Sequence, residues 1–481
     1  MFKPFYLTTT LPYVNAVPHL GTALEFVQAD IIARYQRLKG EEVFFNTGTD
    51  EHGLKIYREA TKAGETPQAY TDRLAGRFQE LKLALNLSYD RFIRTTEPSH
   101  VAAAQEFWKR CEAAGDIYKK EYETHYCVGC ELAKTKSELN DAGRCPVHPD
   151  RDLEIIKEEN YFFRFSKYQD KLLALYDQNP EFVVPAHRLK EVRTFVASGL
   201  EDFSISRLVS SQPWGIPVPG DETQTMYVWF DALVNYISTL GWPHFTEVSR
   251  GKPNDFEKFW PGSQVAGKDN LRQQAAMWQA MLMSANLPPS KQIVIHGFII
   301  SAGQKMSKSL GNVINPFDLV NEYGTDAVRY FLARHINPFE DSDVTLELFR
   351  EVYNANLANG LGNLVSRILK MAELARVTLK DPNPRVTLAS EISGALDHYE
   401  FNRALDFIWQ KVGELDRRIQ TTEPYKLIKT DPEKAKTEIT SLVSELAQLA
   451  HWLTPLLPST AEKITQALTA GKAIEPLFLR K

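Results

Sequence analysis

Two short segments carry residues that could handle a phosphate-bearing substrate. Residues 19–22 read HLGT, in which Gly21 lets the backbone approach a ligand closely and His19 can donate a hydrogen bond to a phosphate oxygen. A helix expected to follow them would offer free N–H groups to a phosphate or a purine. Residues 305–309 read KMSKS, and Lys305 and Lys308 could clamp a polyphosphate while charge moves to its leaving group. Each motif alone is weak evidence, because most such histidines cap a helix and most such lysines face solvent.

A third segment has the spacing of a metal site. Its ligands would be two pairs, each with two residues between its members: Cys127 with Cys130, and Cys145 with His148. Four cysteines in 481 residues are too few for a disulfide scaffold, and the clustering of three of them with a histidine points to a metal in a reducing cytosol. We therefore predict one structural Zn²⁺, and we interpret Cys111 as a buried thiol.

The hydrophobic pattern predicts the elements that must position these residues. Residues 5–9 and 43–46 read as strands, and apolar residues recur at helical spacing over 24–38 between them. A strand, a helix and a strand in this order form a βαβ unit, which implies a parallel sheet with its functional groups at the carboxyl ends of the strands. Further strands are predicted at 226–230, 264–266 and 292–300, and a helix at 271–283.

The pattern also divides the chain. We expect an α/β, Rossmann-like catalytic domain with a parallel sheet, a zinc-binding insertion and a C-terminal all-α bundle. The boundaries that we predict are 1–115 for the first half of the catalytic domain, 116–200 for the insertion, 201–315 for the second half, 316–350 for a connecting stem and 351–481 for the bundle.

The composition excludes several classes of protein. Hydrophobic residues make up 43% and charged residues 24%, as in ordinary soluble proteins. No apolar run approaches the 18 or so residues of a membrane span, and the N-terminus lacks the pattern of a secretory signal, so we expect a cytoplasmic protein. The formal net charge of −5 excludes a globally basic nucleic-acid coat but allows a local basic patch.

Taken together, the motifs resemble those of a known family. HLGT and KMSKSLGN are the paired signatures of class I aminoacyl-tRNA synthetases, and LPY at 11–13, TGTDEHG at 47–53 and MYVWFDA at 226–232 resemble the methionyl-tRNA synthetases among them. The resemblance implies a methionine–tRNA ligase. Such an enzyme activates L-methionine with ATP, accompanied by Mg²⁺, to methionyl-adenylate, and transfers the methionyl group to the 3′ end of tRNA(Met).

The resemblance also implies roles for particular residues. Asp50 would pair with the methionine ammonium, and Lys308 would stabilise the transition state. The catalytic set would be His19, Gly21, Thr22, Lys305 and Lys308. The ATP-binding set would be His19, Gly21, Glu25, Arg207, Asp269 and Lys308, and the methionine-binding set Leu11, Tyr13, Asp50, Trp229, Ala232 and Tyr236.

In the helical region, the resemblance implies an anticodon-binding domain. Asn363 and Arg367 are four residues apart and would project from one helix face toward exposed base edges. Tyr425 would stack on an anticodon base. Some family members carry a further C-terminal domain that dimerises; none is visible here after Pro476, so we expect a monomer.

Two departures from the family pattern leave alternatives open. Thr22 stands where the family usually has a second histidine, and Gln273-Gln274 where it commonly has Phe-His. One alternative is a synthetase for leucine, isoleucine, valine or cysteine. Another is a paralogue that binds RNA without catalysis, which Thr22 and Gln274 favour but which Asp50, Asp269 and the two lysines of KMSKS argue against. Exchange of pyrophosphate into ATP, tested across amino acids, distinguishes the three.

Overall fold

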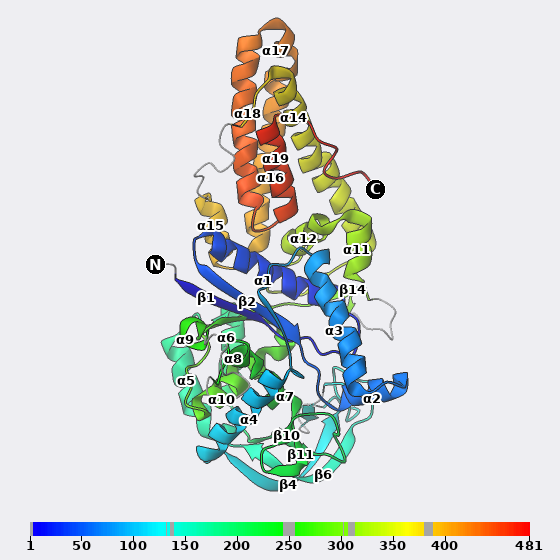
Figure 1. The fold of residues 1–481 in the computed structure, drawn as a ribbon, viewed down its shortest axis with the longest axis vertical. Coiled ribbons are helices and arrows are strands. Elements are labelled where there is room, and N and C mark those ends of the chain that lie inside the picture. The colour runs from blue at the N-terminus through cyan, green and yellow to red at the C-terminus, as the bar shows by residue number, and fades with distance from the viewer. Residues whose placement is uncertain are drawn as a thin grey trace.

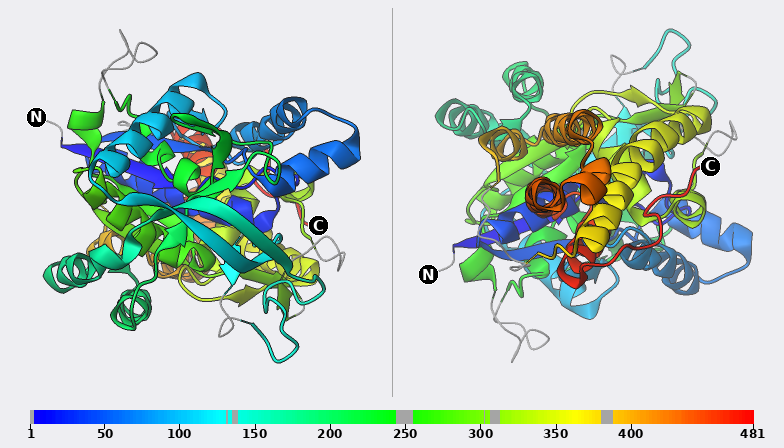
Figure 2. Two further views of the ribbon diagram at one scale, coloured as in Figure 1. Left: turned by 90° about the horizontal axis from the view of Figure 1, so that it is seen from below. Right: turned by 90° about the horizontal axis from the view of Figure 1, so that it is seen from above.

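The computed structural model describes residues 3–130, 132–134, 139–243, 255–301, 303–305, 313–379 and 388–481. It is elongated (Figure 1), with a helical bundle at one end, an α/β layer in the middle and an antiparallel sheet at the other end. Figure 2 gives two views along the long axis. The antiparallel strands are in front when the molecule is seen from below, and the helical bundle is in front when it is seen from above.

The middle layer is built on a six-stranded sheet in the order β3-β2-β1-β12-β13-β7. Every neighbouring pair in it is parallel, which confirms the predicted parallel sheet. Its strands are β1 (Pro4–Thr9), β2 (Glu42–Thr49), β3 (Arg91–Arg94), β7 (Val183–Val184), β12 (Ser263–Gly267) and β13 (Gln292–His296). The central pair, β1 and β12, joins two segments that lie far apart in the sequence, with Thr8 opposite Gln264.

Helices cover both faces of this sheet because successive strand residues point to opposite sides. Leu7 and Val265 pack with α1 and the bundle in one core, whereas Tyr6 and Ala266 pack with α4 and α10 in another. The helices of this layer are α1 (Leu20–Leu38), α2 (Leu54–Ala63), α3 (Pro67–Ala84), α4 (Pro98–Ala113), α7 (Val228–Ala232), α8 (Asn235–Ser238), α9 (Phe256–Phe259) and α10 (Trp278–Ser284). A single π-helical turn, Gln273–Met277, leads into α10.

One expected strand is absent from the structure. Residues 226–230 were predicted as a strand, but β11 ends at Met226 and the helix α7 begins at Val228. All of this apolar run except Trp229 is buried, so it shows no alternation that would separate a strand from a short buried helix.

The predicted insertion and residues 203–226, which follow it, form two small antiparallel sheets. A four-stranded sheet has the order β5-β4-β6-β8, and a three-stranded sheet the order β10-β11-β9. Their strands are β4 (Ile117–Cys127), β5 (Leu132–Lys134), β6 (Glu154–Phe163), β8 (Phe203–Ser204), β9 (Ser206–Leu208), β10 (Pro217–Val218) and β11 (Asp221–Met226). The chain between β6 and β8 contains α5 (Gln169–Gln178), β7 and α6 (Ala186–Ala197). Of these, β7 belongs to the main sheet, because it pairs with β13.

The C-terminal part is helical, as the apolar stripes predict. Its helices are α11 (Pro316–Tyr323), α12 (Thr325–Arg334), α13 (Leu346–Val352), α14 (Asn363–Ala375), α15 (Ser390–Asp397), α16 (Phe401–Thr422), α17 (Pro424–Thr430), α18 (Pro432–Leu453) and α19 (Pro458–Ala470), with a π-helical segment, Tyr353–Gly362, before α14. A small sheet of β14 (Ile299–Ser301), β15 (Gln304–Lys305) and β16 (Ser342–Asp343) lies at the start of this part. None of the described helices is long and apolar enough to cross a membrane.

A buried arginine ties the bundle to the catalytic layer. Arg329 on α12 is fully buried, and its guanidinium lies 2.7 Å from the carboxylate of Asp30 on α1. It also donates to the carbonyl of Leu85 at 3.0 Å and to that of Leu456, between α18 and α19, at 2.9 Å. These contacts satisfy its donors inside the protein, as a buried charge requires. The helix α1, which starts at the HLGT segment, is therefore anchored directly to the bundle.

Candidate active site

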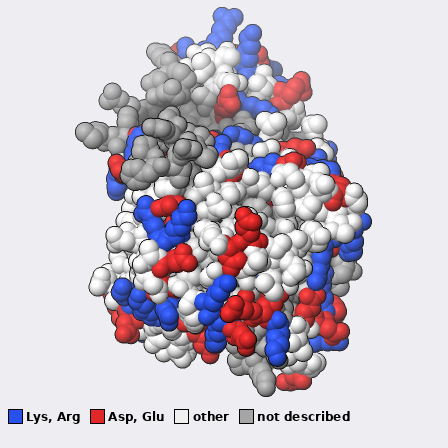
Figure 3. Space-filling view, turned by 60° about the horizontal axis from the view of Figure 1, so that its bottom comes forward, with Lys and Arg blue, Asp and Glu red and all other residues white. Residues whose placement is uncertain are grey.

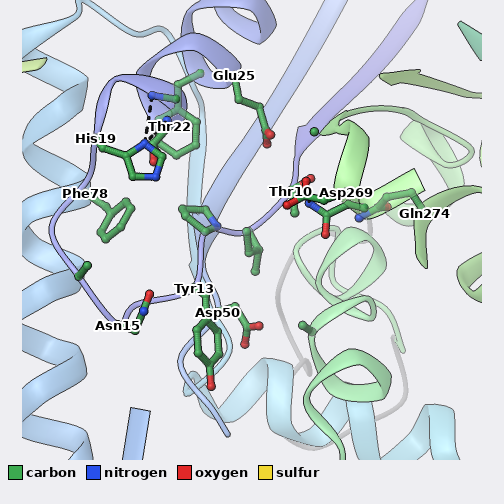
Figure 4. A pocket seen from close by; sticks show the side chains of 18 of the residues that line it. Thr10, Tyr13, Asn15, His19, Thr22, Glu25, Asp50, Phe78, Asp269 and Gln274 are labelled. Carbon is green, nitrogen blue, oxygen red and sulfur yellow. Dashed lines mark hydrogen bonds between the residues drawn. The ribbon is translucent and has the colours of Figure 1, made fainter. Parts of the chain in front are cut away.

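A cavity of about 390 Å³ opens at the carboxyl ends of four parallel strands (Figure 4). Residues just beyond each strand line it: Thr10 after β1, Asp50 after β2, Asp269 after β12, and His296, the last residue of β13, with Gly297. This is the edge at which open parallel sheets bind ligands. Most of the residues that we predicted for methionine or ATP line this one cavity: Leu11, Tyr13, His19, Gly21, Thr22, Glu25, Asp50, Trp229, Ala232, Tyr236 and Asp269.

His19 is the N-cap of α1. Its Nδ1 accepts hydrogen bonds from the N–H groups of Gly21 at 3.0 Å and Thr22 at 3.4 Å. Because Nδ1 accepts, the neutral ring carries its proton on Nε2, which can then donate to a ligand. The N–H groups of Leu20 and Ala23 are hydrogen-bonded as well, to Ile314 and His19 carbonyls. The expectation of free N–H groups at this helix start is therefore wrong, because His19 and the carbonyl of Ile314 already accept from them.

The loop that carries Asp50 is held by its backbone. Asp50 N–H donates to the carbonyl of Pro12, and its own carbonyl accepts from the N–H of Val14, both at 3.0 Å. These bonds bridge the loops that follow β1 and β2. The Asp50 side chain is 7% exposed and lines the cavity beside Tyr13 (Figure 4). The backbone of Asp50 is thus held by main-chain contacts that do not depend on the charge of its side chain.

A buried carboxylate joins this loop to α7. Asp231 accepts hydrogen bonds from His52 at 2.7 Å and His100 at 2.9 Å, and all three side chains are buried. Burial acts to raise the pKa of Asp231, but the charges and hydrogen bonds of the two histidines outweigh it and hold the pKa below its ordinary value. The contact fixes the Asp50 loop against the helix that presents Trp229 and Ala232 to the cavity.

Tyr236 and Gln274 form the deepest polar contact of the cavity. The side-chain amide of Gln274 donates to the Tyr236 hydroxyl at 2.6 Å, and both residues are buried. Burial raises the pKa of Tyr236, so the phenol stays protonated and keeps an O–H to donate. Gln274 occupies the position where the family commonly has histidine, and it provides a partner to this tyrosine that does not titrate.

Glu25 and His296 form a second polar contact, on the other side of the cavity. Glu25 Oε2 lies 2.9 Å from His296 Nε2, and the other ring nitrogen, Nδ1, lies 2.7 Å from the carbonyl of Gly297. Burial raises the pKa of Glu25; His296 opposes this shift and Asp269 adds to it. Burial acts to lower the pKa of His296, but Glu25, the Gly297 carbonyl and Asp269 outweigh it, so this pKa is raised.

Arg207 does not line the cavity. It is 3% exposed and donates to Ser204 Oγ and to the Ser206 carbonyl, both at 2.7 Å. Its guanidinium lies over the rings of Tyr227, at 4.4 Å, and Tyr126, at 5.4 Å. In this structure the arginine supports the wall formed by these tyrosines.

The Cys/His cluster lies at the mouth of the cavity. The ligand atoms of Cys127, Cys130, Cys145 and His148 all lie within 4.8 Å of one another, so they could hold a metal ion. The cavity lining includes Gly129 and Cys130. A Cβ on Gly129 would lie 2.6 Å from the His148 ring, so only glycine fits this turn. The Cys/His cluster therefore forms part of the cavity rim.

Electrostatics of the cluster fit a cation. Burial and neighbouring Cys127 raise the pKa of Cys130, because thiolates crowded together repel each other. Burial also acts on Cys145, but N–H groups of Val147 and His148 donate to its sulfur and hold its pKa below the ordinary value. Such N–H donors stabilise a thiolate, and a bound cation would relieve the repulsion. The donor set of three sulfurs and one imidazole is the one that zinc prefers.

The KMSKS segment is only partly described. Residues 306–312, including Lys308, lie outside the described residues. The backbone of Lys305 ends β15, which pairs antiparallel with β14. The first residue of β14, Ile299, lines the cavity, so the segment starts from the cavity rim.

The three residues expected to read an anticodon lie at the far end of the molecule from the cavity, on α14 and α17 (Figure 1). Asn363 begins α14 and is exposed, and Arg367, one turn later, forms an ion pair with Asp416 of α16. Tyr425 on α17 is 46% exposed. The helices α14 and α17 are in contact.

Several cavity residues were missed by the sequence analysis, among them Asn15, Lys55, His296 and Gly297. A signal existed for the last two, since they interrupt the apolar run 292–300 at the carboxyl end of a predicted strand.

The face that carries the insertion shows basic and acidic side chains interspersed (Figure 3). The described residues of that face carry no field of a single sign, so recognition of a charged ligand by them depends on local contacts.

Comparison with known proteins places these features in context. A sequence profile described as "tRNA synthetases class I (M)" matches residues 5–154 and 148–369. A methionine–tRNA ligase of Synechocystis is 43% identical over 479 residues, with 96% of this chain and 89% of that protein covered. One of Fusobacterium nucleatum is 39% identical, with 99% and 76% covered. The crystal structure of Mycobacterium tuberculosis methionyl-tRNA synthetase with methionyl-adenylate is similar at a TM-score of 0.86 and 37% identity, and covers 100% of this chain and 98% of that one.

Proposed function

Because the chain belongs to the methionyl-tRNA synthetases of class I, we propose that its cavity makes methionyl-adenylate and that the enzyme transfers the methionyl group to tRNA(Met). One observation carries the proposal. The strand ends of both predicted catalytic halves place acidic, aromatic and histidine side chains around one cavity of about 390 Å³.

Methionine occupies the side of the cavity formed by the loops after β1 and β2 and by α7 and α8. Asp50 accepts the ammonium group in a charge-assisted hydrogen bond. Trp229, Ala232 and Leu11 surround the unbranched side chain, and aromatic rings make favourable contacts with a thioether sulfur. The protonated hydroxyl of Tyr236, fixed by Gln274, supplies a donor at the end of this pocket.

ATP occupies the opposite side, along the start of α1 and the ends of β12 and β13. Glu25 and Asp269 lie near the ribose, and His19 Nε2–H donates to the phosphates. A methionine carboxylate oxygen attacks the α-phosphorus, the bond to the bridging oxygen breaks, and pyrophosphate leaves with the bonding electrons. No enzyme nucleophile takes part, so the protein acts by holding the two substrates in line and by stabilising charge.

Lys305 and Lys308 stabilise the pyrophosphate as it leaves, and Thr22 contributes a neutral hydroxyl where the family pattern has a second histidine. Magnesium, when bound with ATP, neutralises phosphate charge. In the second step, a hydroxyl of the terminal adenosine of tRNA attacks the methionyl carbonyl, and AMP leaves with its electrons. We assign Arg207 a supporting role behind Tyr227, since it is held by Ser204 and Ser206.

Cys127, Cys130, Cys145 and His148 would hold a structural zinc ion. With four protein ligands the site would leave no open position for chemistry, and the described residues offer only soft or borderline donors at this place. Gly129 and Cys130 line the cavity, so ligation by these residues would fix one edge of the site.

The helical bundle recognises the anticodon CAU through Asn363, Arg367 and Tyr425. Tyr425 is exposed enough to stack on a base. Arg367 is paired with Asp416, which orients its guanidinium and leaves other N–H groups of its fork for a base edge. We accordingly divide the chain into a catalytic domain of 1–115 and 201–315, an insertion of 116–200, a stem of 316–350 and an anticodon-binding domain of 351–481. The strand β7 lies in the insertion by sequence but pairs with β13 of the main sheet.

Pyrophosphate exchange tests the proposal directly. The full-length protein is incubated with ATP, magnesium, labelled pyrophosphate and one amino acid at a time. Label should enter ATP with methionine and far less with leucine, isoleucine, valine or cysteine. Exchange with another amino acid in preference to methionine would reassign the pocket, and no exchange with any would leave a non-catalytic RNA-binding protein.

A further inference from the structure

His296 is a buried histidine at the nucleotide side of the cavity, and the sequence analysis gave it no role. It ends β13, the strand next to β12, and its side chain is 6% exposed. Both ring nitrogens have partners: Nδ1 faces the Gly297 carbonyl at 2.7 Å, and Nε2 faces Glu25 Oε2 at 2.9 Å. Gly297 is packed against the next segment: a Cβ there would lie 2.2 Å from the backbone of Glu340, so no side chain fits at this position.

These two contacts fix how many protons the pair holds. A carbonyl oxygen only accepts, so Nδ1 must carry a hydrogen. The 2.9 Å contact between Nε2 and the carboxylate then needs one more hydrogen, on either atom. The pair is therefore an imidazolium with a carboxylate, or a neutral imidazole with a carboxylic acid. In both forms Glu25 and His296 together have no net charge.

Removing that hydrogen would leave two acceptors facing each other. A lone pair on Nε2 would point at an ionised carboxylate, and the site would gain one negative charge beside Asp269. Asp269 acts on both members of the pair, raising the pKa of each. The raised pKa of His296 means that the folded protein holds this proton more tightly than a free histidine does.

Other charged groups nearby do not replace the proton. Lys268, next to Asp269, is engaged with Asp341 at 2.7 Å. Tyr236, across the cavity, stays a neutral phenol. His19, at the start of α1, uses Nδ1 to cap its helix. Among the described residues around the pair, the local balance therefore depends on the one hydrogen between Glu25 and His296.

We propose that His296 is a positioning residue for ATP, and that ATP binds tightly only while His296 and Glu25 share one proton. The shared proton holds the Glu25 carboxylate in place for the ribose and cancels a negative charge close to the polyphosphate. The inference rests on the proposed function in that ATP enters this cavity. By linkage, the affinity for ATP falls up to tenfold for each pH unit once the pair loses its proton.

The test compares KM for ATP in pyrophosphate exchange from pH 6 to pH 9.5, with methionine saturating. His296→Gln keeps an amide N–H near the position of Nε2, but the amide neither takes up nor releases a proton, so the pair can no longer share one. Its KM for ATP should exceed the wild-type value at low pH, and the ratio of the two should fall toward one as pH rises. His398→Gln, which alters an exposed histidine of the bundle, is the matched control and should follow the wild type.

A second variant tests the proton count itself. In Glu25→Gln the amide can donate to a neutral His296, so no shared proton is needed, and the pH dependence of KM for ATP should disappear even if the rate falls. A ratio of His296→Gln to wild-type KM that stays constant over the whole pH range would overturn the proposal, because a purely structural role shifts KM equally at each pH. Absence of methionine-dependent exchange in the wild type would instead refute the proposed function.

Discussion

Asp50→Asn tests the assignment of the methionine ammonium site. The change removes the negative charge and preserves the shape of the side chain. The loop should keep its conformation, because Asp50 is tied to Pro12 and Val14 through backbone bonds of 3.0 Å. Any loss of activity then reports on what the carboxylate binds.

The structure sets the size of the effect. Asp50 is 7% exposed, so its partner in the complex is largely shielded from water. Breaking one side of a buried, hydrogen-bonded charge pair costs about 2–5 kcal/mol. The asparagine oxygen still accepts a hydrogen bond, so we expect the lower part of that range, about 2–3 kcal/mol. At about 1.4 kcal/mol per factor of ten, kcat/KM for methionine should fall roughly 30- to 150-fold.

Pyrophosphate exchange at varied methionine and at varied ATP separates the two sites. KM for ATP should change little, because the nucleotide lies on the other side of the cavity. Asp72→Asn serves as the control, since that carboxylate is half exposed and pairs with Arg94. The desamino analogue of methionine, used as an inhibitor, completes a thermodynamic cycle.

The analogue has no ammonium group, so wild type and Asp50→Asn should bind it about equally. If the variant lost affinity for the analogue as much as for methionine, the carboxylate would be holding the pocket together and the assignment would be refuted.

Three further predictions concern other parts of the enzyme. Elemental analysis should find one zinc ion per chain, and Cys127→Ser should lower the zinc content together with methionine-dependent exchange, because three ligands hold the ion less well; a folded and active protein without metal would contradict this. Lys308→Ala should slow adenylate formation about a hundredfold in single-turnover kinetics, since one such donor is worth on the order of 3 kcal/mol, while methionine binding stays nearly unchanged; an unchanged rate would remove this lysine from the mechanism. Arg367→Ala should lower kcat/KM for tRNA charging by the equivalent of about 1–3 kcal/mol and leave pyrophosphate exchange intact. Tyr425→Ala should cost a similar amount, and Tyr425→Trp should be tolerated. If Arg367→Ala damaged exchange as much as charging, Arg367 would be supporting the fold.

The fold followed from local patterns wherever the pattern was periodic. The βαβ unit at the N-terminus, the parallel sheet and the long helices of the bundle were confirmed. Residues 226–230 were mistaken for a strand because a largely buried segment shows no polar face. The two residues of β7 could not be foreseen, since they join the sheet by pairing with β13, and this partner is remote in the sequence.

The candidate site could be predicted where motifs mark the ends of strands. Most of the residues placed by motif line one cavity, because those motifs lie in the segments that follow β1, β2, β11 and β12. Arg207 does not, since its own neighbours Ser204 and Ser206 hold it in the wall. His296 was overlooked because its proposed role depends on its contact with Glu25. The two residues are remote in the sequence, and only the folded sheet brings them together.

The position of β1 in the main sheet has a consequence for how the enzyme is made. During synthesis β1 can pair with β2 early, but its other edge pairs with β12, and Thr8 must wait for Gln264. Tyr6 likewise waits for the carbonyl of Tyr236. Until then the ribosome carries an incomplete sheet whose inner edge is open, a state that invites chaperone binding. A truncated chain that stops before β12 lacks Asp269, Gln274 and His296, so prematurely terminated products are without the nucleotide side of the cavity.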